Sequence, residues 1–146
     1  MKSFFIDTKK PATLKDLEEA GVIYEYITPD TETYMTPLKA WMQKRGYASY
    51  DEVRLSEKTP NLDALLGKFI DEHLHTDDEV RYVVSGSGIF DVRSKEDQWI
   101  RIIVTAGDFI IVPADLYHRF MLGEEKMIHA VRLFKDNPSW VPVYRL

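Results

Sequence analysis

The chain contains no cysteine among its 146 residues. No disulfide can stabilise the fold and no thiolate can bind a metal, so any bound metal must be held by imidazole and carboxylate groups. Basic residues are in the minority: 19 lysines and arginines stand against 24 aspartates and glutamates, which gives a formal net charge of −5. Because neutralising phosphates requires a basic surface, we expect no nucleic-acid partner.

Long apolar runs are missing as well. The run Phe-Ile-Ile-Val at residues 109–112 is among the longest, and it is far too short to cross a bilayer. Near the N-terminus, Asp7 interrupts the apolar residues before they reach the length of a signal-peptide core. We therefore expect a cytoplasmic protein without a membrane partner, with nuclear residence as an alternative if the protein is eukaryotic.

What the chain does contain is enough apolar material for one core. The hydrophobic content is 45% and the aromatic content 12%, which suits an ordinary folded domain of this length. We predict a single domain over residues 1–146. Its helical N-terminal portion spans about residues 1–70, and a metal-binding barrel is built from about residues 22–27 and 70–146.

Helix signals occur only in the first half of the chain. Thr13 can cap a helix that Gly21 stops, and Thr36-Pro37 can start a second helix that ends at Gly46. A third helix is expected after Asn61, where apolar residues have helical spacing. The second half therefore has to supply most of the β structure.

From residue 73 onward, short β-like segments alternate with turn signals, which is typical of a sandwich or barrel. We read Gly86-Ser87-Gly88 as a turn between two of these segments. The expected strands are residues 79–85, 89–93, 98–104, 109–112, 118–122 and 127–134. The sequence thus predicts a mainly β protein with a few N-terminal helices.

Four side chains in this half have the composition of a metal site. His73 and His75 share one face of an extended segment, Glu79 has the same parity, and His118 returns after about two hairpins. Nitrogen and oxygen ligands of this kind suit iron, nickel, manganese, cobalt or zinc rather than calcium or magnesium. His129 is read as a structural residue, with proton transfer as the alternative.

The surrounding glycines and proline strengthen this interpretation. The pattern Gly67-x5-His73-x-His75-x3-Glu79-x6-Gly86 resembles the first cupin motif throughout. The pattern Gly107-x5-Pro113-x4-His118 is similar to most of the second cupin motif. The resemblance implies a cupin-type β-barrel, a double-stranded β-helix or jelly roll, that binds one metal ion per chain.

A closer resemblance extends over nearly the whole chain. The residues that carry it resemble the acireductone dioxygenase family, and they are densest from about residue 62 to residue 144. They comprise Glu72-His73-Leu74-His75, Asp78-Glu79-Val80-Arg81-Tyr82, Gly86 to Arg93, Trp99-Ile100-Arg101, Tyr117-His118-Arg119-Phe120 and Val131-Arg132-Leu133-Phe134.

This resemblance implies an activity in methionine salvage. Members of the family use O2 to cleave 1,2-dihydroxy-3-keto-5-methylthiopentene. With Fe(2+) they yield 4-methylthio-2-oxobutanoate and formate, and with Ni(2+) they yield 3-methylthiopropanoate, formate and CO. Alternatives are a cupin that binds a small molecule without turnover, another metal-dependent cupin enzyme such as an isomerase, and a purely structural barrel. We expect a monomer.

The resemblance also assigns roles to residues around the metal ligands. Arg81 and Arg132 would stabilise a dianionic substrate, with a salt bridge to a carboxylate as the alternative for each. The aromatic residues Phe69, Phe120 and Trp140 would wall the pocket around the thioether, with a plain core role as the alternative. The two acidic residues Glu72 and Asp78 would orient the imidazoles or aid metal loading, with simple solvation as the alternative.

Three positions depart from the family pattern. Asp115 stands where the family usually has glycine after Pro-Ala, at a position that we expect to be left-handed. Leu122 replaces the terminal Asn of the second cupin motif. The chain also ends at Leu146, earlier than many members of the family.

Overall fold

The computed structural model describes residues 1–30, 32–136, 138–139 and 141–146. Three helices occur in this part of the chain: α1 (Leu14–Glu19), α2 (Met35–Arg45) and α3 (Leu62–Gly67). The strands in the same ranges are β1 (Lys2–Phe5), β2 (Ile23–Tyr26), β3 (Ser49–Ser56), β4 (His73–Leu74), β5 (Glu79–Arg93), β6 (Trp99–Thr105), β7 (Asp108–Val112), β8 (His118–Leu122), β9 (Met127–Phe134) and β10 (Val143–Tyr144). The prediction of a mainly β fold with N-terminal helices is confirmed. None of the described helices is long and apolar enough to span a membrane.

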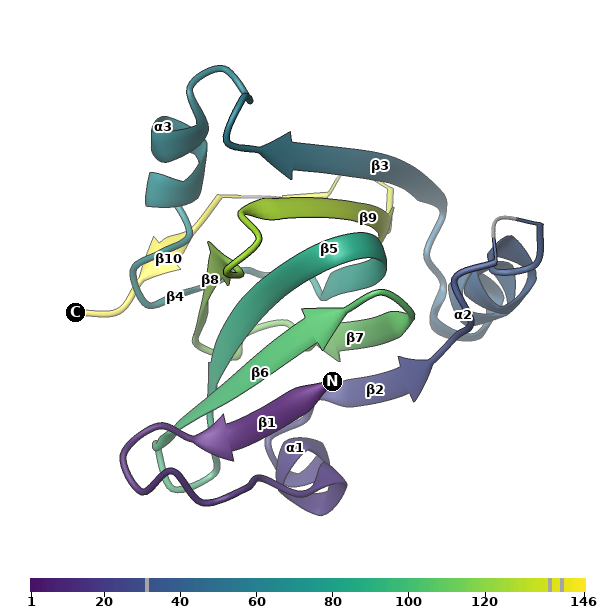
Figure 1. Cartoon of the computed structure of the whole chain (residues 1–146). Helices are drawn as coiled ribbons and strands as arrows, with labels where there is room; N and C mark the ends of the chain where they lie inside the picture. Colours follow the sequence, from purple (N-terminus) through teal and green to yellow (C-terminus); the bar gives the residue numbers. More distant parts are fainter. Residues whose placement is uncertain (31, 137, 140) are drawn as a thin grey trace.

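Two antiparallel sheets share the long strand β5 (Figure 1). One sheet runs β1-β6-β5-β8-β4-β10, and the other runs β2-β7-β5-β9-β3. Each outermost strand of the described chain pairs with one neighbour, so the sheets roll around the core without closing into a ring of hydrogen bonds. This geometry brings β4 and β8 together with the start of β5, where the four predicted ligands lie.

The expected turn at Gly86-Ser87-Gly88 is wrong, because β5 continues through it as one strand of 15 residues. Ser87 and Gly88 stay paired with β6, while the register against β9 shifts between Val83 and Ser85. Gly86 has a φ of +79°, so the strand bends sharply at this residue instead of reversing. The bend is what allows β5 to pass from one sheet into the other.

Gly86→Ala should therefore lower the free energy of unfolding of the metal-free protein by ~3 kcal/mol. A Cβ atom at this position would overlap the carbonyl oxygen of Met127, and the positive φ disfavours any L side chain. Urea unfolding measures the loss. Gly67→Ala is the matched control, since a Cβ there meets no atom within 4 Å. Equal stability of the two variants would contradict this account of the bend.

The N-terminal portion is less helical than expected, because it also contributes edge strands to both sheets. β3 pairs with β9 over eight residues, from Ser49 opposite Phe134 to Ser56 opposite Met127. β1 pairs with β6 from Lys2 opposite Ile103 to Phe5 opposite Ile100. The prediction that the barrel draws only on residues 22–27 and 70–146 is therefore wrong. The Ser, Asp, Glu and Arg residues of β3 have little strand propensity, and its pairing with β9 overrides that preference.

The three helices follow their capping signals. The Thr13 side chain accepts from the Asp16 amide and the Asp16 carboxylate accepts from the Thr13 amide, which completes a capping box at α1. α2 ends at Gly46, which has a left-handed conformation. Leu17 of α1 and Leu38 of α2 are fully buried against the sheets.

The alternation of side chains along β5 separates the core from the site. Val80 and Tyr82 are fully buried in a cluster with Leu38 and Phe109, on the α2 side of the sheet. Glu79 and Arg81, which have the opposite parity, face the cavity inside the rolled sheets. One strand therefore supplies both packing residues and the polar groups of the site.

Candidate metal centre and adjoining cavity

Three histidines converge inside the rolled sheets. His73 on β4 lies directly opposite His118 on β8 in the antiparallel register. The ring of His73 is centred 4.5 Å from that of His118 and 4.8 Å from that of His75. One ring nitrogen from each residue lies within 4.8 Å of those of the other two. All three side chains are buried.

Glu79 completes the set at the first residue of β5. Its Oε2 lies 3.3 Å from Nε2 of His118. This oxygen and the Nε2 atoms of His73, His75 and His118 are buried and have no hydrogen-bond partner. Ring nitrogens of the three imidazoles lie within 4.8 Å of one another and the carboxylate oxygen lies beside His118, and four such unpartnered buried atoms are costly unless a ligand satisfies them. Three nitrogens and one carboxylate oxygen fit a divalent transition metal.

Backbone carbonyls hold the other nitrogen of each imidazole. Nδ1 of His73 lies 2.7 Å from a carbonyl oxygen, Nδ1 of His118 lies 2.8 Å from one, and Nδ1 of His75 lies 3.3 Å from one. The accepting carbonyls belong to Asp71, Leu116 and Val141, respectively. A carbonyl can only accept, so Nδ1 carries the proton in each case. The Nε2 lone pair is therefore left for a metal.

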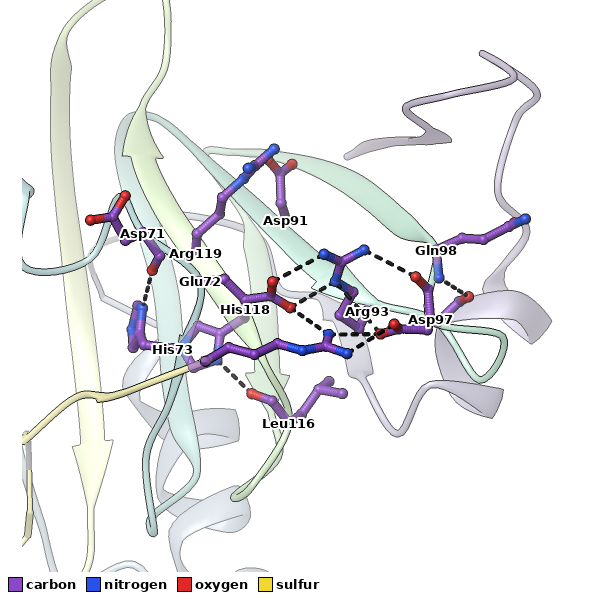
Figure 2. A network of polar contacts seen from close by, with 12 residues as sticks. Asp71, Glu72, His73, Asp91, Arg93, Asp97, Gln98, Leu116, His118 and Arg119 are labelled. Atoms are coloured by element: carbon purple, nitrogen blue, oxygen red, sulfur yellow. Dashed lines mark hydrogen bonds and ion pairs between the residues drawn. The ribbon is translucent and has the colours of Figure 1, made fainter.

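These contacts correct the expectation that the Glu72 carboxylate orients an imidazole. Glu72 instead accepts hydrogen bonds from Arg93, at 2.7 and 3.0 Å, and from Arg145 at 2.9 Å. Figure 2 shows Glu72 turned toward Arg93, while His73 turns toward the Asp71 carbonyl. Arg93 and then Arg145 keep the pKa of Glu72 below its usual value, although burial opposes them. Its carboxylate belongs to a surface network beside the site.

Asp78 does not contact an imidazole among the described contacts either. Its carboxylate accepts from the guanidinium of Arg45 at 3.1 Å and from the Tyr47 hydroxyl at 2.8 Å. It also accepts from the backbone amide of Ala114 at 2.9 Å. Asp78 therefore braces the turn before β8 and ties it to the end of α2.

The electrostatics differ between the ligands: burial alone would lower the pKa of His118, but the Glu79 carboxylate overrides it and raises that pKa. Burial lowers the pKa values of His73 and His75, so both rings are neutral at neutral pH. Burial alone would raise the pKa of Glu79, but attraction to Arg81 and His118 overrides it and holds the pKa well below its usual range. The carboxylate is thus ionised where a metal ion would lie.

A cavity of about 250 Å³ opens beside these ligands. Its polar end is formed by Glu79, Arg81 and Arg132. The remaining walls are apolar and come from β3, α3, β5, β8, β9 and the segment after α3: Val53, Leu55, Leu65, Leu66, Phe69, Phe90, Phe120, Ile128 and Ala130. The cavity therefore suits a small molecule with anionic oxygens at one end and an apolar chain at the other.

The two predicted arginines lie opposite each other, on β5 and β9. Arg81 donates to Glu79 Oε1 at 3.2 Å and to the Val80 carbonyl at 2.9 Å. Arg132 donates through Nε and Nη2 to the two carboxylate oxygens of Asp51, at 2.7 and 2.5 Å. Each arginine thus forms the salt bridge to a carboxylate that the sequence left open as its alternative role. Because both also line the cavity, these pairings fix the guanidinium groups at its polar end.

Two of the three predicted aromatic residues line the cavity, namely Phe69 and Phe120. The Phe69 ring is centred 5.6 Å from that of His73 and 6.1 Å from that of His75. Trp140 lies outside the described residues. His129 is separate from this group, since its Nε2 lies 3.1 Å from Glu52.

The sequence interpretation missed Asp51, and with it the partner of Arg132. The polar sequence of β3 gave little indication that this segment is a strand. Asp51 lies on β3 and pairs with Arg132 in the β3–β9 register. It also missed the apolar lining from β3, for the same reason. The available sequence signal was the alternation of polar and apolar residues in this strand, where Val53 and Leu55 have the same parity as Asp51.

Asp115 takes the left-handed conformation that the sequence predicted, with a φ of 66°. Its backbone amide donates to the carbonyl of His75 at 2.8 Å, so this turn supports a ligand-bearing segment. A β-carbon is strained in this region of φ, though Asp tolerates it better than most residues.

Asp115→Ala should consequently lower the free energy of unfolding by about 1 kcal/mol, whereas Asp115→Gly should not lower it. Thermal unfolding of the metal-free variants compares the two. A glycine variant less stable than the alanine variant would contradict the backbone argument.

Comparisons with known proteins agree with this geometry. Residues 4–142 match the model of the ARD/ARD′ family. An acireductone dioxygenase of Heterostelium pallidum is 51% identical over 99% of this chain and 98% of its own length. One from Dictyostelium discoideum is 47% identical over 99% of each chain. A solved acireductone dioxygenase from Bacillus anthracis, with a cadmium ion in its active centre, matches with a TM-score of 0.90 at 32% identity, over 99% of this chain and 98% of its own. The chain belongs to the ARD/ARD′ family.

Proposed function

We propose that this protein is a metal-dependent acireductone dioxygenase that cleaves 1,2-dihydroxy-3-keto-5-methylthiopentene with O2. The observation that carries the proposal is the set of four unpartnered ligand atoms, Nε2 of three histidines and Oε2 of Glu79, beside a cavity with two arginines. The family relationship supports the same reaction.

The proposed metal ligands are His73, His75, Glu79 and His118, which hold one Fe(2+) or Ni(2+) ion. When bound, the metal supplies Lewis-acid and template chemistry for the enediolate and for oxygen. These four residues would hold the metal and would leave it accessible to exogenous groups such as the substrate. The carbonyls that accept from Nδ1 hold the three rings in the orientation that this requires.

Arg81 and Arg132 stabilise the deprotonated substrate. Both are at the polar end of the cavity, where a dianion meets two guanidinium groups in a site screened from water. The charges of Arg81, Arg132, Glu79 and Asp51 sum to zero, so a divalent metal adds two positive charges and a dianionic substrate balances them. The site is therefore matched in charge to an enediolate.

The apolar end of the cavity takes the methylthio side chain. Phe69 and Phe120 are among the lining residues, and aromatic rings make favourable contacts with sulfur. The same walls exclude water from the reacting carbons. The pocket role of Trp140 stays a prediction from the sequence, as do a role of Glu72 and Asp78 in metal loading, the cytoplasmic location and the monomeric state.

Asp51 acts as a positioning residue for Arg132, since it accepts two hydrogen bonds from its guanidinium. Asp51→Asn should lower kcat/KM about 10-fold, because an amide cannot accept both bonds and the guanidinium becomes mobile. Steady-state kinetics of metal-loaded protein measure the loss. Glu52→Gln, one residue along β3 and bonded to His129 away from the cavity, is the matched control. An unchanged kcat/KM in Asp51→Asn would show that Asp51 does not position Arg132.

The proposed function is tested by adding anaerobically prepared acireductone to metal-loaded protein in air. Oxygen uptake above the metal-free control is expected. The iron form should yield formate and 4-methylthio-2-oxobutanoate, and the nickel form 3-methylthiopropanoate, formate and CO. No uptake with either metal would rule out the dioxygenase. Product formation without oxygen would instead indicate an isomerase.

A further inference from the structure

The C-terminal residues 141–145, which we call the C-terminal strap, lie against the metal-binding strand. β10 pairs with β4, with Val143 opposite Leu74 and Tyr144 opposite His73. Figure 1 shows β10 running beside β4 at the end of the molecule that also carries α3. At the start of the strap, the Val141 carbonyl lies 3.3 Å from Nδ1 of His75. The strap thus supplies the acceptor that fixes the tautomer of one proposed metal ligand.

Little apolar burial holds the strap in place. Val141 is 70% exposed, Val143 47% and Tyr144 43%. β10 pairs with β4 at only two positions, and the Tyr144 hydroxyl donates to the Lys68 carbonyl at 3.0 Å. Segments with so few buried contacts open easily unless polar groups secure them. Just upstream of the strap, the Ser139 amide donates to the Asp77 carboxylate at 2.8 Å. The contact of Val141 with His75 therefore depends on this bond and on what fixes the other end of the strap.

That end is fixed by Arg145. Its guanidinium donates to both carboxylate oxygens of Asp97, at 2.8 and 2.9 Å, and to Glu72 Oε2 at 2.9 Å. Its backbone amide also donates to the Glu72 carbonyl at 3.1 Å. A bidentate pair with a second carboxylate is the strongest geometry that arginine offers. Arg145 therefore ties the strap to the residue before His73 and to the turn between β5 and β6.

Arg93 holds both of the acidic residues that anchor Arg145. Arg93 donates to Glu72 through Nε and Nη2 and to the Asp97 carbonyl at 3.0 Å. Figure 2 shows Glu72, Arg93 and Asp97 joined in this network beside His73 and His118. Two arginines and two carboxylates balance in charge, and such a network loses less side-chain entropy per bond than an isolated surface pair. Removing Arg145 leaves this anchor intact but releases the strap.

We propose that Arg145 is a latch for the C-terminal strap and thereby sets how firmly the centre retains its metal. With Arg145 in place, the Val141 carbonyl stays on Nδ1 of His75 and keeps Nε2 directed at the metal site. Without it, the strap opens and His75 loses the acceptor that orients its ring. Loss of such an outer partner typically weakens metal binding 10- to 100-fold. This inference rests on the metal site alone, and it does not require the proposed reaction.

The test is the rate at which full-length, Ni(2+)-loaded protein releases its metal to an excess of a chromophoric chelator. Arg145→Ala should release nickel about 10-fold faster than wild type. Arg54→Ala, which removes an exposed arginine on the outer face of β3, should stay within about twofold. The thermal midpoint of metal-free Arg145→Ala should equal that of wild type, because the strap is a small exposed segment. A nickel-release rate of Arg145→Ala within twofold of wild type would overturn the proposal. A thermal midpoint of the metal-free variant well below that of wild type would also overturn it, because the faster release would then reflect a less stable fold.

A second variant tests the latch itself. Asp97→Asn keeps Glu72 as a partner of Arg145 and should speed nickel release by less than Arg145→Ala does. The double variant should release nickel no faster than Arg145→Ala alone, because both changes break the same contact. If the two effects multiply, Arg145 and Asp97 act independently and the latch does not exist.

Discussion

His118→Ala protein, purified and freed of metal, should bind Ni(2+) less than about one-hundredth as tightly as wild type. Loss of an outer partner alone costs 10- to 100-fold in metal affinity, and this change removes a ligand. His118 contributes a buried Nε2 with no other partner, so alanine leaves three donors and a gap beside Glu79. Isothermal titration with Ni(2+) measures the affinity.

His129→Ala is the matched control for this experiment. His129 is also on a strand of the rolled sheets, but its ring bonds to Glu52 and lies apart from the ligand group. Its removal should leave nickel affinity unchanged. Equal nickel affinity of the His118→Ala and His129→Ala proteins would refute the assignment of His118 as a ligand.

Arg132→Ala should keep its metal and lose turnover. Removing one preorganised donor to a developing anion typically costs about 100- to 1,000-fold in kcat. Arg132 lines the polar end of the cavity, and it is held there by two bonds to Asp51 on an edge strand. Oxygen uptake with acireductone measures turnover, and metal analysis of the same sample measures retention.

Two further variants sharpen that result. Arg132→Lys keeps the charge but cannot make the bidentate contact, so it should recover only part of the activity. Arg54→Ala, on the exposed face of the neighbouring strand, should behave as wild type. Normal turnover in Arg132→Ala would show that Arg132 does not stabilise the substrate. Arg81 would then be the remaining proposed partner of the anion.

The sequence predicted the clustered ligands from their short spacing, His118 from the second cupin motif, and Arg81 and Arg132 from the family resemblance. His73 and His75 are two residues apart on one extended segment, and the glycine pattern around Glu79 and His118 is specific. The helices were likewise predictable, because Thr13 and Gly46 provide local capping signals whose effect depends on few other residues.

The parts that the sequence did not reveal depend on distant backbone. The carbonyls of Asp71, Leu116 and Val141 orient the imidazoles, and a carbonyl carries no sequence signal. The sequence favours a turn at Gly86 because glycine permits both a reversal and a bend. Only the pairing of Ser87 with β6 decides between them.

The polar strand β3 could not be predicted from its own sequence either. Its sequence Ser-Tyr-Asp-Glu-Val-Arg-Leu-Ser has a weak preference for strand, and its eight-residue pairing with β9 supplies the stabilisation. Asp51 therefore could not be connected to Arg132 before the fold was known. Tertiary pairing, rather than local preference, created this contact.

The central claim is that one metal ion is held by three imidazole nitrogens and one carboxylate oxygen. X-ray diffraction from crystals of nickel-loaded protein, measured at the nickel absorption edge, locates the ion directly. We predict one anomalous peak per chain, about 2 Å from Nε2 of His73, His75 and His118 and from Oε2 of Glu79. A nickel ion bound elsewhere, or one with Glu79 beyond bonding distance, would contradict the account.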